Sequence, residues 1–135
     1  MRTGWRSIGA LGTAVAIVAP GCDASSPTAP SGVAVVTFQV VNEQFRVRLT
    51  TEDQLRAAQA AQAGGQATIP VGRIVAGAEV NTGWSWHLED VTFAEVAIEV
   101  CDGLPSHVEQ AGGPGYALGW YCPWGARVLE IRTTR

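Results

Sequence analysis

The sequence predicts an α+β domain with a mainly antiparallel sheet of about five strands, one alanine-rich helix, one short helix and one disulfide. Three observations lead to this class. Short runs rich in β-branched residues alternate apolar with polar positions, which is typical of strands with one buried face. An alanine-rich segment that ends at Gly64-Gly65 has the composition of a helix. Cys101 and Cys122 can form a bridge, and 135 residues are enough for one such domain.

Residues 1–21 have the features of a lipoprotein-type signal peptide. Two arginines precede the apolar run Ile8–Ala19, which is too short to span a bilayer as a helix. The run leads to Gly21-Cys22, which resembles a bacterial lipobox, although the two residues before Gly21 depart from the usual pattern. We therefore expect a lipid anchor on Cys22 and a flexible tether over residues 22–32, followed by a single domain over residues 33–135. Ordinary cleavage with free secretion is the alternative.

The cysteine count is consistent with an exported chain that has one bridge. Three cysteines leave one unpaired if Cys101 and Cys122 form a disulfide, and acylation of Cys22 would use the third thiol. A metal site is the alternative for the pair, but neither cysteine lies in a CxxC motif. We expect the disulfide, with no metal and no cofactor.

The first half of the domain is predicted to be a hairpin followed by a helix. The β-branched run Val33–Val41 is followed by polar residues, and Phe45–Leu49 then alternates apolar with charged positions. This alternation places the three apolar side chains of Phe45–Leu49 on the buried face of the hairpin. Thr51 and Gln54 fit a capping box in front of the alanine-rich helix Leu55–Ala63.

The second half is predicted to contain further strands and a short helix. In chain order these are the strand Gln66–Gly77, an extended segment Trp84–His87, a turn at Glu89-Asp90, the strand Thr92–Cys101, the helix Pro105–Gln110, a glycine-rich loop over 111–119 and the strand Ala126–Arg132. The strand Thr92–Cys101 alternates throughout and would present Glu99 on its mixed face. Its buried face would consist of Ala94, Val96, Ile98 and Val100. In the last strand, Val128 and either Leu129 or Ile131 would face the core.

Several short motifs from Val71 onward resemble those of one family of small secreted domains. They are Gly72-x-Ile74-Val75, Trp84-Ser85-Trp86-His87-Leu88, Ala97–Gly103, Pro105, Val108-Glu109 and Cys122-Pro123-Trp124. The family is named after the N-terminal domain of a slime-mould seventy-four-kilodalton binding protein, and its bacterial and fungal members are often labelled calmodulin-like. The resemblance covers roughly Val36–Ile131 and implies the fold and an exported location rather than a chemistry. No segment of the sequence has the alternating acids, central glycine and final glutamate of an EF-hand loop.

His87 is the candidate for acid–base chemistry. With Glu99, or with Glu95 or Asp102, it could form a His–carboxylate pair. No serine or cysteine stands in a recognisable nucleophile elbow, and no HExxH motif occurs. A histidine between two apolar residues of an extended segment is more often structural, with its ring nitrogens bound by backbone groups or a carboxylate. We therefore expect a structural role for His87.

The tryptophans are the candidates for ligand binding. Trp84, Trp86, Trp120 and Trp124 could form an aromatic platform for a sugar or a cationic group. The alternative is that at least two of them fill the core and that Trp124 packs on the disulfide. The binding candidates are therefore Trp84, Trp86, His87 and Trp124.

Charge excludes nucleic acid as a partner and leaves two classes of function. The nine basic residues are all arginines without a basic stripe, and loss of residues 1–21 would change the net charge from −3 to −5 by removing Arg2 and Arg6. The first class is a non-catalytic binding module that acts outside the cytoplasm, anchored through Cys22, for an envelope or extracellular protein or a glycan. The second is a small secreted hydrolase that uses His87 and a carboxylate such as Glu99.

Overall fold

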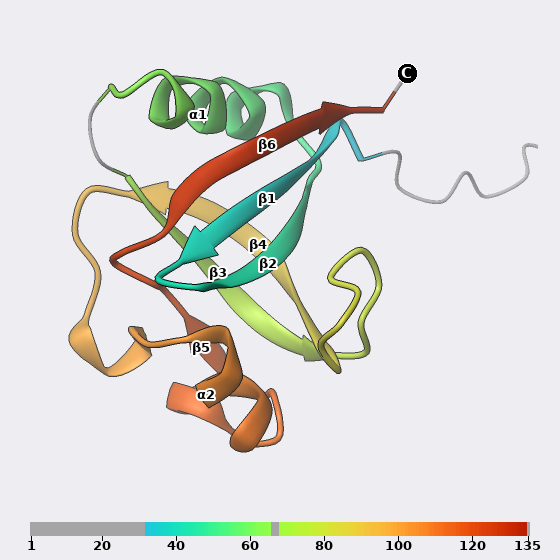
Figure 1. Ribbon diagram of the computed structural model, residues 1–135, viewed down its shortest axis with the longest axis vertical. Helices are drawn as coiled ribbons and strands as arrows, with labels where there is room; N and C mark the ends of the chain where they lie inside the picture. Colours follow the sequence, from blue (N-terminus) through green and yellow to red (C-terminus); the bar gives the residue numbers. More distant parts are fainter. Residues whose placement is uncertain (1–31, 66–67, 135) are drawn as a thin grey trace, which may run out of the picture.

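Six β-strands form two antiparallel three-stranded sheets in the computed structural model, which describes residues 32–65 and 68–134 (Figure 1). The first sheet has the order β2-β1-β6 and consists of β1 (Ala34–Val40), β2 (Glu43–Leu49) and β6 (Arg127–Thr133). The second has the order β4-β3-β5 and consists of β3 (Ile69–Ala76), β4 (Trp86–Ala94) and β5 (Trp120–Tyr121). The α+β class is confirmed, whereas the prediction of one sheet of about five strands is wrong.

Helices connect the strands at both ends of the sheets. They are α1 (Glu52–Gln62), α2 (Pro105–Gln110) and the 3₁₀ helices η1 (Glu99–Cys101) and η2 (Tyr116–Gly119). The helix α1 packs beside β6 at one end, and α2 lies near β5 at the other (Figure 1). Among the described residues, no helix is long and apolar enough to cross a membrane. The predicted signal peptide, the tether and Cys22 lie outside the described residues.

The capping box predicted for α1 is confirmed. The Thr51 hydroxyl accepts a hydrogen bond from the backbone N–H of Gln54 at 3.2 Å, and the Gln54 side chain accepts one from the backbone N–H of Thr51 at 3.1 Å. The Gln54 amide also donates to the carbonyl oxygen of Val91 at 2.6 Å. One residue therefore both starts the helix and ties it to β4, while Leu55 and Ala58 supply its buried face.

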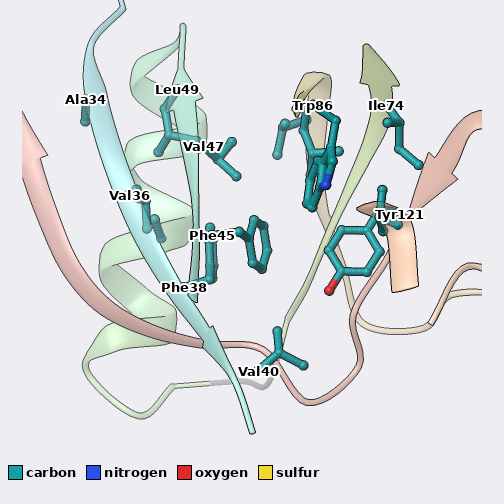
Figure 2. Packing of buried hydrophobic residues seen from close by; sticks show 14 of the residues in the cluster. Ala34, Val36, Phe38, Val40, Phe45, Val47, Leu49, Ile74, Trp86 and Tyr121 are labelled. Carbon is teal, nitrogen blue, oxygen red and sulfur yellow. The ribbon is translucent and has the colours of Figure 1, made fainter. Parts of the chain in front are cut away.

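The core lies between the two sheets, because each presents one apolar face to the other. The first sheet contributes Ala34, Val36, Phe38, Val40, Phe45, Val47 and Leu49, which confirms the predicted inward face of the hairpin. Trp86 and Tyr121 face these residues from the second sheet (Figure 2). Phe45 packs edge-on against Tyr121 with ring centroids 5.4 Å apart, and Trp86 does so at 5.5 Å. This aromatic cluster joins the sheets.

The strand β6 reaches the core with two residues of unequal spacing. Thr37 pairs with Glu130, but Phe38 pairs with Val128, so Leu129 is an extra residue at a β-bulge. The bulge lets both Val128 and Ile131 pack against the core, although a regular strand would put them on opposite faces. Leu129 is exposed, and the open choice between Leu129 and Ile131 is settled in favour of Ile131.

The predicted strand Thr92–Cys101 is wrong, because β4 starts earlier and ends at Ala94. The ladder stops there since its partner β3 begins at Ile69, which pairs with Ala94. Beyond this point Val96, Ile98 and Val100 are 76%, 68% and 64% exposed instead of buried.

The predicted turn at Glu89-Asp90 is also wrong. Both residues lie inside β4, where the register with β3 shifts between Val71 and Arg73 and Asp90 has a φ of 52°. The acids therefore mark a bulge within the strand rather than its beginning.

The disulfide between Cys101 and Cys122 is confirmed, with Cα atoms 5.1 Å apart. Both cysteines are buried together with Ile69 in a second apolar cluster, against which Val71 and Ala97 pack. Ile69 and Val71 point away from the main core, since Pro70 and Ile74 alternate with them along β3 and are buried. The disulfide thus fastens an outer layer of chain to the back of the second sheet.

Candidate functional site

His87 lies on the outward face of β4, between the inward side chains of Trp86 and Leu88. Its side chain is only 11% exposed. Nδ1 lies 2.6 Å from the carbonyl oxygen of Gly77, and Nε2 lies 3.3 Å from a carboxylate oxygen of Glu89. Both ring nitrogens therefore have polar partners within the protein, as a structural histidine requires.

The structure does not bring His87 together with Glu99. Glu99 begins η1, in the outer layer beyond the end of β4, and no ion pair or hydrogen bond joins the two residues in residues 32–65 and 68–134. The carboxylates near His87 are those of Glu89 and, at 3.9 Å, Glu79. Sequence reasoning missed both, because the pairing with Glu89 depends on the strand continuing through Glu89 and Asp90.

His87 belongs to a row of alternating charges on the second sheet and its neighbouring loop. We define this charged row as Arg48, Glu79, His87, Glu89, Arg73 and Asp90. Arg48 pairs with Glu79 at 2.6 Å, and Arg73 pairs with Glu89 at 2.7 Å. Hydrogen bonds from Asp90 and Glu89 raise the pKa of the Arg73 guanidinium above its ordinary value.

A cavity of about 600 Å³ lies beside the charged row, lined by parts of β4 and by residues before and within α1. Its charged groups already neutralise one another in pairs, as Arg48 does with Glu79. Nothing in the described part of the chain gathers three or more metal-binding side chains. The cavity therefore has polar walls but no assembled nucleophile, base and oxyanion site.

The four candidate tryptophans lie in different environments. Trp86 is completely buried in the main core, and Trp84 is half-buried beside it, with ring centroids 6.2 Å apart. The Trp84 indole N–H donates to the carbonyl oxygen of Gln44 at 2.8 Å. Trp120 and Trp124 are exposed but line two different grooves. Trp84 and Trp86 thus pack as core residues, while the two exposed indoles belong to the outer layer.

Trp120 lines an apolar groove in the outer layer over the second sheet. We define this apolar groove by its main lining residues, which are Val71, Ala94, Val96, Ala97, Ile98 and Trp120, around a volume of about 330 Å³. Trp120 is 41% exposed, and Glu95 and Glu99 are exposed neighbours of Val96 and Ile98. Sequence reasoning missed the groove, because the alternation that makes Val96 and Ile98 resemble a buried strand face is the same in an extended segment without a partner strand.

A constrained turn stands beside the apolar groove, directly before Trp120. Ala117 and Leu118 both have positive φ values, of 40° and 59°, and Leu118 is almost fully exposed. Such conformations cost about 1–3 kcal/mol for residues other than glycine and persist only where the surroundings enforce them. Here Ala117 packs on the disulfide cluster, and the hydroxyl of the preceding Tyr116 donates to the carbonyl oxygen of Asp102. The fold thus holds an apolar side chain in solvent.

These features define a small two-sheet α+β domain whose outer layer is stapled by a disulfide and exposes apolar side chains. The family model of the BP-74 N-terminal domain, the domain of the seventy-four-kilodalton binding protein, matches residues 32–135. The chain therefore belongs to this domain family, and the resemblance drawn from the short motifs is confirmed. No curated protein and no solved structure matches the chain significantly.

Proposed function

We propose that this chain is a non-catalytic binding module for a protein partner outside the cytoplasm. The observation that carries the proposal is the set of apolar side chains that the outer layer leaves in solvent. They are Val96, Ile98, Val100, Leu118 and Trp120. Scattered exposed apolar residues are ordinary, but a group of them around a groove is typical of a surface that a partner covers.

A protein fits this surface better than a glycan does. Sugars are bound by flat aromatic faces, and Trp120 is the one aromatic residue among those lining the apolar groove. Val96 and Ile98 contribute branched aliphatic surface, which packs well against the apolar side chains of another protein. Trp124 lines a separate groove of about 300 Å³ and is not needed for this contact.

The alternative function, a hydrolase that uses His87, has less support. Its ring nitrogens face Gly77 and Glu89, and its side chain is nearly buried. A general base must reach a proton of the substrate or of a nucleophile. The binding module needs no such group, and for it His87 serves only to hold the end of β3 to β4.

The location outside the cytoplasm is part of the proposal. It rests on the predicted signal peptide, on the lipidation expected at Cys22 and on the Cys101–Cys122 disulfide, a bond typical of exported proteins. Intact-mass analysis of the membrane fraction should find a diacylglyceryl group on a chain that begins with Cys22. An unmodified chain in the medium that lacks Cys22 would contradict the anchor while leaving the binding module open.

The test of binding is crosslinking of the full chain in its native envelope, followed by recovery of the crosslinked partner. Val96→Ser should reduce the yield of this partner, whereas Val41→Ser should not, because Val41 is equally exposed (75%) but lies in the turn between β1 and β2. Equal yields with both variants would contradict the proposed surface. A His87→Ala variant that melts like the wild type but loses a measurable hydrolytic activity would favour the enzyme instead.

A further inference from the structure

The apolar groove has acidic neighbours that no cation of the domain neutralises. Glu95 and Glu99 alternate with Val96 and Ile98 along the outer segment, and both carboxylates belong to exposed residues. Within residues 32–65 and 68–134, neither takes part in an ion pair. Two carboxylates therefore stand free beside the most exposed aliphatic side chains of the groove.

The nearest candidate cation is already occupied. Arg73 pairs along the ladder with Trp120, which lines the groove, but its guanidinium binds Glu89 at 2.7 Å and Asp90 at 3.0 Å. Its charge is thus spent on the charged row rather than on Glu95 or Glu99. This leaves the groove side of the second sheet net negative, on a chain whose net charge is itself negative.

We infer that the partner inserts a bulky apolar side chain into the apolar groove, between Ile98 and Trp120, and flanks it with lysine or arginine residues that pair with Glu95 and Glu99. The inference rests on the proposed function and adds the chemistry of the partner. Complementary charge around an apolar contact fixes the register of the two surfaces and speeds their encounter. The groove volume of about 330 Å³ is enough for one or two large side chains rather than for a whole drug-sized ligand.

A membrane fits these observations less well than a protein does. Insertion of Val96 and Ile98 into a bilayer would draw Glu95 and Glu99 into the interface, where anionic headgroups repel carboxylates. Membrane-binding apolar surfaces instead carry lysine and arginine, and this chain contains no lysine at all.

A second copy of the chain is the other competing occupant. The edge strand β6 carries the exposed residues Arg127, Leu129 and Arg132, so it offers apolar and basic groups together. Contact between β6 of one copy and the apolar groove of another would be head-to-tail and would make the apparent mass depend on concentration. The experiment below separates this case from a foreign partner.

The experiment selects short random peptides displayed on phage against the immobilised full chain. Peptides that combine Lys or Arg with Leu, Phe or Trp should be enriched on the wild type, and binding of the selected peptides should weaken about tenfold with Val96→Ser or Ile98→Ser, as for loss of a contact at the centre of an interface. Glu95→Gln with Glu99→Gln should weaken binding several-fold and reduce its dependence on salt. Val41→Ser is the matched control and should bind like the wild type. Because all these residues are exposed, the variants should remain folded.

Several results would overturn the inference. Selected peptides without an excess of basic residues would show that charge does not choose the partner, and selection unaffected by Val96→Ser would place the contact elsewhere. Sedimentation that shows self-association sensitive to both Val96→Ser and Arg127→Ser would assign the groove to a second copy. Binding to vesicles of neutral lipid that depends on Val96 would assign it to a membrane. If envelope crosslinking still depends on Val96 while these peptides fail, the binding module stands and only the proposed chemistry of its partner falls.

Discussion

The side-chain oxygen of Asn81 accepts a hydrogen bond from the backbone N–H of Arg46 at 2.8 Å, and this bond joins the loop before β4 to the strand β2 of the other sheet. The side-chain N–H₂ of the same residue donates to the carbonyl oxygen of Trp86 at 2.9 Å. Asn81 is completely buried, so water cannot replace either bond. The sequence identifies residues 81–83 only as a turn, yet Asn81 holds the two sheets together at the end where the charged row lies.

We expect Asn81→Ala to lower the free energy of unfolding by about 1–3 kcal/mol, because it leaves a buried backbone N–H and a buried carbonyl without partners. Urea denaturation followed by fluorescence measures this change. Thr82→Ala is the matched control, since Thr82 accepts only an exposed hydrogen bond from the Arg46 side chain and should change stability by less than about 0.5 kcal/mol. Equal denaturation midpoints for the two variants would disprove the role of Asn81.

Gly103→Ala should also destabilise the domain. Gly103 has a φ of 146°, and a Cβ added there would lie 2.5 Å from the Tyr116 hydroxyl oxygen. We expect a loss of about 1–3 kcal/mol from this contact and from the unfavourable backbone conformation. Gly125→Ala is the control, because its Cβ would meet no atom within 4 Å and its φ is not positive. That variant should equal the wild type or be up to about 1 kcal/mol more stable, and a loss as large as that of Gly103→Ala would contradict the explanation.

The stability of the domain should fall at alkaline pH because of Tyr121. Burial raises the pKa of its phenol far above the ordinary value, and its hydroxyl donates to the carbonyl oxygen of Gly103 at 2.8 Å. Above pH of about 10 the unfolded chain releases this proton while the folded domain keeps it, so unfolding is favoured as pH rises. The limiting slope is about 1.4 kcal/mol per pH unit for one proton.

Denaturation between pH 8 and 12 tests this dependence in a chain that has two tyrosines and no lysine to titrate in the same range. Tyr121→Phe should be less stable at neutral pH by about 1 kcal/mol through loss of its hydrogen bond. Its stability should then fall less steeply above pH of about 10. The remaining slope belongs to Tyr116, whose pKa is also raised by burial. An identical alkaline slope with and without Tyr121 would rule out its titration as the cause.

Removal of the disulfide should loosen the outer layer. We expect Cys101→Ala combined with Cys122→Ala to lower the free energy of unfolding by about 2–5 kcal/mol, mostly because the unfolded chain is no longer restricted. Chemical reduction of the wild type should produce a similar loss under the same urea titration. Peptide mapping without reductant that found both thiols free in the wild type would contradict the bridge itself.

Local patterns of the sequence were enough to predict the hairpin, the capping box of α1, the helix Pro105–Gln110 and the disulfide. Each depends on neighbours in the chain or on a strict alternation, as Thr51 and Gln54 show for the start of α1. The short motifs also predicted the family, which the match over residues 32–135 confirms. These features needed no knowledge of which strand lies beside which.

The tertiary structure decided what local alternation cannot. Val96 and Ile98 alternate with polar neighbours as in a buried strand, but a strand face is buried only where a partner strand and an opposing layer exist, and β3 pairs no further than Ala94. The same shortage of long-range information hid the pairing of His87 with Glu89, which requires β4 to run through a bulge. The apolar groove and the charged row are therefore products of strand register, and register is set by contacts between segments far apart in the sequence.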